Sequence, residues 1–349
     1  MITRRALWTL LLAPLLALGG VAVAFYEPDL PASEVEALYA DSESLFLEVL
    51  GSRVHVKDEG DPELPALLLL HGFASSLHTW DGWASELSGR FRIVRLDLPG
   101  FGLTGPNQAG EDGAGDYSTS YRIRVIERVL EERGVGRASV AGNSLGGLVA
   151  WRYAQAHPER VAALVLVNAA GAPRGGPGAE AADAAAPKRG FRTLDLLRIP
   201  MAAELMQGLT PRFLIASSLE QVYADPGKIT DPTIDRHHRM LLREGNRRAI
   251  LDAMRSHGGR LPPSGAAPLS AIQQPTLVMW GRQDRWIPPA DAEIFRDAIP
   301  NSELVIYDDA GHVPMEELPA RSARDAADFL QRQLAGREHG ATPAAEPGG

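Results

Sequence analysis

The chain has 349 residues, of which 45% are hydrophobic and 23% are charged, proportions that are typical of a soluble globular protein. This length can bury a core without disulfides and corresponds to one large domain or two modest ones. The formal net charge of −9 argues against a nucleic-acid partner. Because the chain contains no cysteine, disulfides, a thiol nucleophile and Cys-ligated metal sites are excluded.

The first 26 residues predict export from the cytoplasm. Arg4 and Arg5 precede an uncharged, mostly apolar stretch from Ala6 to Tyr26, which as a helix would reach about 30 Å and could span a bilayer. Basic residues before it and acidic residues after it favour an exported remainder. We favour a membrane anchor because the stretch exceeds the ~7–15 apolar residues of a signal peptide, but the Ala-Val-Ala sequence at 22–24 also fits a cleavage site. Both outcomes are extracytoplasmic, either membrane-anchored or periplasmic or secreted, and we expect a bacterial source.

Strands and helices alternate in the next part of the chain. A β-hairpin is predicted over residues 45–56. The further predicted strands cover 66–70, 91–96, 139–141 and 161–167, and the predicted helices cover 81–89, 121–133 and 145–157. This alternation predicts an α/β fold with a mostly parallel central sheet and helices on both faces.

The alternation stops between residues 172 and 262, where linker composition is followed by helical patterns alone. It then resumes, with predicted strands at 276–280 and 304–307 and predicted helices at 290–299 and 319–335. The expected organisation is a signal peptide or anchor at 1–26, a linker at 27–44, an α/β core at 45–171 and 263–336, an inserted helical cap or lid at 172–262, and a disordered tail at 337–349.

A candidate nucleophile lies at the end of a predicted strand. The sequence Gly-Asn-Ser-Leu-Gly at 142–146 has the pattern G-x-S-x-G, and it directly precedes a predicted helix. This context is typical of a nucleophile elbow, in which the serine occupies a strained turn and the glycines allow a close approach of backbone. We therefore predict that Ser144 is a nucleophile.

A serine hydroxyl needs a base to take its proton and an acid to orient that base. Asp284 directly follows the predicted strand at 276–280, and His312 directly follows the predicted strand at 304–307. Both thus lie at carboxyl ends of strands, in the chain order that accompanies a nucleophile elbow. We predict that His312 is the general base and then acid, oriented by Asp284. The strand at 161–167 is followed by Asn168, which excludes an acid at that position.

Other histidines and acids are assigned structural roles. His71 lies in a turn after an apolar strand, and Asp97 is interpreted as a residue that holds a loop. His237 and His238 are expected on a solvent-facing side of the helical insertion. The remaining histidines, which have no acid and strand end in their sequence context, are His55, His78, His157, His257 and His339.

Acyl transfer also requires donors for the developing oxyanion. We predict the backbone N–H of Leu145, the residue after the nucleophile, as one donor. The second donor should come from the loop after an earlier strand, and we assign it to the backbone N–H of Phe73.

Five ordered motifs resemble the signature set of the α/β-hydrolase superfamily. They are Leu-His-Gly-Phe at 70–73, Asp-Leu-Pro-Gly-Phe-Gly at 97–102, Gly-Asn-Ser-Leu-Gly-Gly at 142–147, Trp-Gly-Arg-Gln-Asp at 280–284 and Gly-His at 311–312. The resemblance covers about residues 45–171 and 263–335. It implies an α/β-hydrolase fold with a helical cap and a serine esterase or lipase-like activity through an acyl-enzyme, with neither a metal nor an organic cofactor.

The resemblance also narrows the reaction. Haloalkane dehalogenases and epoxide hydrolases use an Asp nucleophile, so Ser144 argues against both. The elbow and the Trp-Gly-Arg strand end are similar to those of meta-cleavage-product C–C hydrolases. However, the loop after residue 70 lacks their additional glycines, and Val313 replaces an aromatic residue. We therefore expect a small-molecule ester or lipid-like substrate, with the membrane as a further partner if residues 1–26 are not cleaved. The alternatives are a C–C or amide hydrolase and a non-catalytic binding protein on the same fold.

Overall fold

The structure is a computed structural model that describes residues 25–108, 115–173, 208–256 and 268–340. The signal peptide or anchor predicted at 1–26 lies almost entirely outside these residues. Within the described part of the chain, no helix combines the length and the apolar character that crossing a membrane requires.

Eight strands form one central sheet. They are β1 (Ser44–Val49), β2 (Ser52–Glu59), β3 (Ala66–Leu70), β4 (Arg92–Leu96), β5 (Ala138–Asn143), β6 (Val161–Val167), β7 (Thr276–Gly281) and β8 (Ser302–Tyr307). Their order in the sheet is β1-β2-β4-β3-β5-β6-β7-β8. Strand β2 pairs antiparallel with β1 and β4, as the predicted hairpin requires, and all other pairs are parallel. The predicted α/β fold with a mostly parallel sheet is confirmed.

Helices cover both faces of this sheet. Because side chains alternate along a strand, Leu68 and Leu70 of β3 join the core on one face, and Leu67 and Leu69 join the core on the other. The first face packs against α4 (Thr119–Glu132), α5 (Leu145–Ala156) and α12 (Ala290–Ala298), and the second against α3 (Asp81–Leu87) and α14 (Pro319–Gly340). Three short helices complete the described part of the core: η1 (Leu77–Trp80), η4 (Leu269–Ala271) and α13 (Pro314–Glu317). A fourth, η3 (Pro226–Lys228), lies in the part of the chain between β6 and β7.

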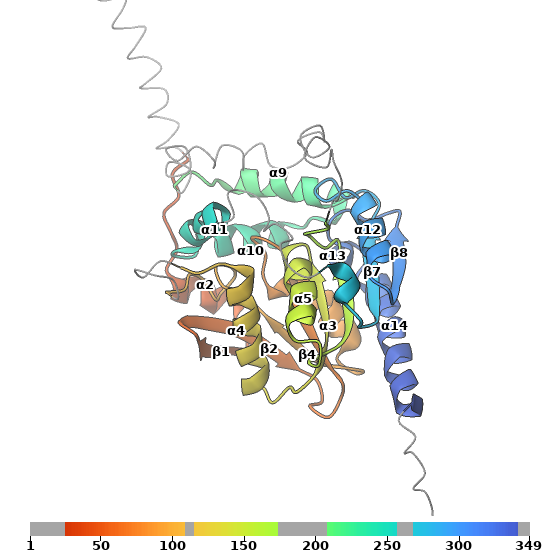
Figure 1. Ribbon diagram of the computed structural model, residues 1–349. Helices are drawn as coiled ribbons and strands as arrows, with labels where there is room; N and C mark the ends of the chain where they lie inside the picture. The colour runs from red at the N-terminus through yellow and green to blue at the C-terminus, as the bar shows by residue number, and fades with distance from the viewer. Residues whose placement is uncertain (1–24, 109–114, 174–207, 257–267, 341–349) are drawn as a thin grey trace, which may run out of the picture.

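A helical cap lies over one end of the sheet (Figure 1). It contains α9 (Arg212–Val222), α10 (Asp231–Leu242) and α11 (Asn246–Ser256), which occur in the chain between β6 and β7. The predicted cap insertion also includes residues 174–207 and 257–262, which lie outside the described residues.

Two predicted segments differ from the structure. The linker predicted at 27–44 contains a helix, α2 (Ala32–Tyr39), which follows Pro31. Val35 of this helix is fully buried in a small core with Leu103 and Met240, and this packing holds the segment in place. The proline content of the segment gives no sign of this packing. The prediction of a disordered tail from residue 337 is wrong for residues 337–340, because α14 continues to Gly340.

Candidate active site

The predicted nucleophile occupies a sharp turn between β5 and α5. Ser144 has φ 53° and ψ −115°, a strained backbone conformation for a residue with a side chain. A Cβ at Gly142 would lie 2.3 Å from the carbonyl oxygen of Gly146, and a Cβ at Gly146 would lie 2.2 Å from that of Leu70. Only glycine fits at both positions, so the pattern G-x-S-x-G holds the serine at the carboxyl end of the sheet.

The predicted base and acid form a buried hydrogen-bonded pair. The Nδ1 of His312 lies 2.7 Å from Oδ2 of Asp284, and the side chains are 5% and 0% exposed. The other carboxylate oxygen accepts the backbone N–H groups of Trp286 and Ile287 at 2.7 and 3.0 Å. An ionised carboxylate can only accept, so Nδ1 of a neutral His312 carries the proton and Nε2 keeps a lone pair for a substrate proton.

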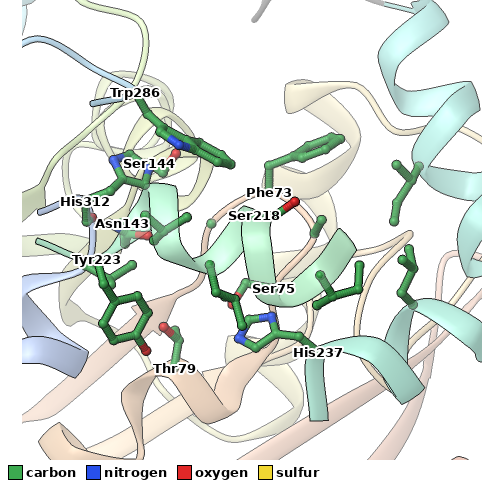
Figure 2. Close-up of a pocket in the computed structure, with 18 of the residues that line it drawn as sticks. Phe73, Ser75, Thr79, Asn143, Ser144, Ser218, Tyr223, His237, Trp286 and His312 are labelled. Carbon is green, nitrogen blue, oxygen red and sulfur yellow. Dashed lines mark hydrogen bonds between the residues drawn. The ribbon is translucent and has the colours of Figure 1, made fainter. Parts of the chain in front are cut away.

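Ser144 and His312 border the same cavity. Figure 2 shows Ser144 beside the His312 ring, with Trp286 above them. The indole of Trp286 stacks on the imidazole with ring centroids 5.4 Å apart. The structure therefore brings the predicted nucleophile, base and acid together at one edge of the sheet, beside one cavity.

Asn168 is a site residue that sequence reasoning missed. Its Nδ2 donates to Oδ2 of Asp284 at 2.6 Å, and its Oδ1 accepts the N–H of Gly281 at 3.3 Å. The residue has φ +45°, a region that asparagine tolerates better than most residues. The available signal was its place directly after β6, the strand next to β7. That place by itself indicates only that no acid follows β6.

The main chain of His312 is held from two sides. Its carbonyl accepts the side-chain amide of Asn143 at 3.0 Å, and its N–H donates to the carbonyl of Val222, the last residue of α9, at 2.8 Å. The preceding N–H, of Gly311, donates to Oε1 of Glu317 at 2.6 Å. The elbow and the cap thus position the imidazole together.

The loop after β3 is fixed by His71. Its Nδ1 lies 2.7 Å from the carbonyl oxygen of Gly72, and its Nε2 accepts the N–H of Leu98 at 2.9 Å. Burial lowers the pKa of His71, consistent with the neutral ring that these bonds require. The structural role predicted for His71 is confirmed. Phe73 borders the cavity, and Leu145 begins α5, where no helical carbonyl accepts its N–H. Both positions are compatible with the predicted oxyanion donors.

Asp97 holds loops, as predicted. Its carboxylate accepts the N–H groups of Leu77 at 2.6 Å and Leu103 at 2.7 Å. Its Oδ2 also lies 2.9 Å from Nδ1 of His55. Burial raises the pKa of Asp97, but the hydrogen bond from His55 and the electrostatic effects of His55, His71 and His78 together outweigh burial and lower the pKa. The sequence context of His55 shows no acid, because its partner lies after a different strand, β4.

The solvent-facing positions predicted for two histidines of α10 are wrong. His237 borders the cavity. His238 is buried, and its Nε2 lies 2.9 Å from the carbonyl oxygen of Thr210 and 2.7 Å from Oε2 of Glu27. The periodicity of a polar helix does not reveal which of its faces covers a cavity.

The cavity encloses about 220 Å³ between the sheet and the cap. All three cap helices contribute to its apolar wall, through Leu214, Ile215, Leu219, Val222, Leu241, Ile250 and Leu251. Arg247 also borders it, but this guanidinium donates to Asp29 at 2.6 and 2.9 Å and to Thr210 at 2.9 Å. An apolar chain is therefore the group that this wall accommodates best.

The sequence and the structure are both similar to those of known hydrolases. The model of the "Alpha/beta hydrolase family" matches residues 67–326. A 2-hydroxy-6-oxononadienedioate/2-hydroxy-6-oxononatrienedioate hydrolase from Burkholderia vietnamiensis is 28% identical, over 80% of this chain and 91% of that protein. A bacterial membrane phospholipase A has a similar structure, with a TM-score of 0.67 and 26% identity over 95% of this chain and 99% of its own. A meta-cleavage product hydrolase from Pseudomonas fluorescens has a TM-score of 0.66 and 21% identity, over 83% of this chain and 98% of its own.

The hydrogen bond from Asn168 to Asp284 leads to a prediction about the rate at which Ser144 reacts. In Asn168→Gly the backbone keeps its freedom at positive φ, but Asp284 loses a donor and the imidazole loses part of its orientation. We expect the rate constant for labelling by a fluorophosphonate to fall roughly 10- to 100-fold, measured by gel fluorescence over time.

The matched control is Asn301→Gly, which removes an exposed amide that donates to the carbonyl of Gln273. This variant should label at the wild-type rate. An Asn168→Gly protein with an unchanged circular dichroism spectrum and unchanged labelling rate would show that Asn168 has no positioning role.

Proposed function

Because the chain belongs to the α/β-hydrolase family, we propose that it is a serine hydrolase that cleaves carboxylic esters through Ser144, His312 and Asp284. The hydrogen bond from His312 to Asp284, beside the cavity that holds Ser144, carries this proposal. It gives the imidazole the tautomer and the orientation that a general base needs.

In the proposed reaction, the hydroxyl oxygen of Ser144 attacks the ester carbonyl while Nε2 of His312 takes its proton. The carbonyl oxygen becomes an oxyanion that accepts the N–H groups of Phe73 and Leu145. Collapse of this intermediate breaks the carbon–oxygen bond, and His312 returns the proton to the departing alcohol. Water, deprotonated by His312, then attacks the acyl-enzyme and releases the acid and free Ser144.

The relatives also support a second candidate, a C–C bond hydrolase. Several curated relatives are named as 2-hydroxy-6-oxononadienedioate hydrolases, and these names favour C–C cleavage over ester cleavage. The structural similarity to a membrane phospholipase A, which covers more of the chain, supports an ester substrate.

The charge of the cavity favours the ester. A dienedioate carries two carboxylates, which need cations or several donors when they leave water. Arg247 is already paired with Asp29, and burial lowers the pKa of His237 to about 3, so its ring is neutral. Among the described residues that border the cavity, only Arg247, His237 and His312 have basic side chains. Glu316 adds a carboxyl group of its own.

A substrate panel separates the two candidates. We expect kcat/KM on p-nitrophenyl alkanoates to exceed kcat/KM on vinylogous diketones and on anilides, because the described residues around the cavity offer an apolar wall and no unpaired cation. Ser144→Ala should lower ester hydrolysis at least about a thousandfold. Phe73→Ala keeps its backbone N–H, so its loss should be far smaller. Faster turnover of the diketone than of every ester would make the C–C hydrolase the better account.

We further propose that residues 1–26 export the enzyme and, if uncleaved, anchor it to a membrane. The support is the uncharged stretch from Ala6 to Tyr26 behind two arginines. Fractionation of C-terminally tagged full-length protein should find it with the membranes, or in the periplasm if the segment is cleaved. Recovery from the cytoplasm would contradict export.

A further inference from the structure

The cavity has a second polar region besides the candidate active site. Ser75, in the loop after β3, and His237, in the middle of α10, both border it. In the view of Figure 2, Ser75 and His237 lie on the same side of the cavity, apart from Ser144, His312 and Trp286. Between the two regions the apolar residues of the cap form the wall.

Most other polar side chains around the cavity already have partners. Thr79 and Tyr223 donate to Glu316, and the Ser218 hydroxyl donates to the carbonyl of Leu214 at 2.8 Å. Arg247 is bonded to Asp29 and Thr210.

Ser75 and His237 differ from these residues. Within the described ranges, no residue forms a hydrogen bond with the Ser75 hydroxyl or the His237 ring. Both residues are partly buried and border the cavity, so within the described ranges only water can pair with them there. A ligand that displaces this water loses affinity unless it replaces the hydrogen bonds that the water makes.

The charges around this pair define the ligand that fits. Burial and the neighbouring Arg236 lower the pKa of His237 to about 3, so the ring can donate one hydrogen bond and accept one. The Ser75 hydroxyl has the same capacity. The carboxyl group of Glu316 borders the cavity as well and disfavours an anion. An uncharged oxygen, in a hydroxyl or a carbonyl group, satisfies the pair best.

We propose that Ser75 and His237 form a subsite that binds an uncharged hydroxyl or carbonyl oxygen carried by the substrate at a fixed distance from the scissile ester. The inference rests on the proposed ester hydrolase function and narrows its substrates to esters with an oxygenated chain. A site built to hydrogen-bond a hydroxyl discriminates strongly against the analogue that lacks it, since the site groups are then left unpaired.

The test compares p-nitrophenyl esters of ω-hydroxyalkanoic acids with the plain alkanoates of equal chain length. For wild type, the ratio of the two kcat/KM values should pass through a maximum of roughly tenfold or more at one chain length, where the hydroxyl reaches the subsite. His237→Leu and Ser75→Ala should each flatten this maximum. His237→Gln, which keeps a neutral donor and acceptor, should restore part of it.

The control applies the same replacement to a histidine far from the cavity. His157, whose ring lies 3.4 Å from Glu127, should tolerate His157→Leu with the maximum unchanged. A ratio that is flat in wild type, or a maximum that survives both His237→Leu and Ser75→Ala, would overturn the subsite.

Binding of α,ω-alkanediols and 1-alkanols to Ser144→Ala gives a readout that needs no catalysis. By calorimetry, the diol of matching length should bind more tightly than the alcohol, and adding His237→Leu should remove the difference. If no ester is hydrolysed but this difference is found, the subsite stands and the ester hydrolase proposal fails. If esters are hydrolysed but neither assay depends on His237, only the subsite fails.

Discussion

The buried carboxylate of Asp284 is the interaction on which the rest of the site depends. It accepts four hydrogen bonds, from the ring of His312, the amide of Asn168 and the N–H groups of Trp286 and Ile287. A carboxylate that is removed from water needs hydrogen-bond donors of this kind. Together the four donors hold the carboxylate in one orientation. That orientation fixes the imidazole, which in the proposed reaction takes the proton of the Ser144 hydroxyl.

The sheet and the cap contribute different parts of the site. Strand ends supply the groups that we propose act on the scissile bond, and the cap helices supply most of the aliphatic side chains in the cavity wall. The two parts are joined at His312, whose N–H donates to the carbonyl of Val222 at the end of α9. A second bond, from Arg247 to Asp29, ties α11 to the segment before α2. A cap exchanged between such enzymes would thus alter both the choice of substrate and the support of the base.

Much of the fold and the reacting side chains could be predicted from sequence, because their signals are local. Apolar runs predict strands, and Ser144, Asp284 and His312 each come within a few residues of a strand end. The position of Asn168 directly after β6 is also a local signal, but its hydrogen bond joins it to Asp284, 116 positions further along the chain. The place of His237 at the cavity has no local signal, since it depends on how the cap packs over the sheet. The helix α2 was missed for the same reason: Val35 is ordered by Leu103 and Met240, which a local reading cannot pair with it.

The central claim, that Asp284 and His312 activate Ser144 beside two backbone donors, is tested most directly by a crystal structure of the chain after reaction with an alkyl phosphonate ester. The account predicts phosphorus bonded to the side-chain oxygen of Ser144, and a phosphoryl oxygen about 2.7–3.1 Å from the nitrogens of Phe73 and Leu145. His312 should remain bonded to Asp284. Phosphorus on any other residue, or a phosphoryl oxygen directed away from both nitrogens, would contradict the account.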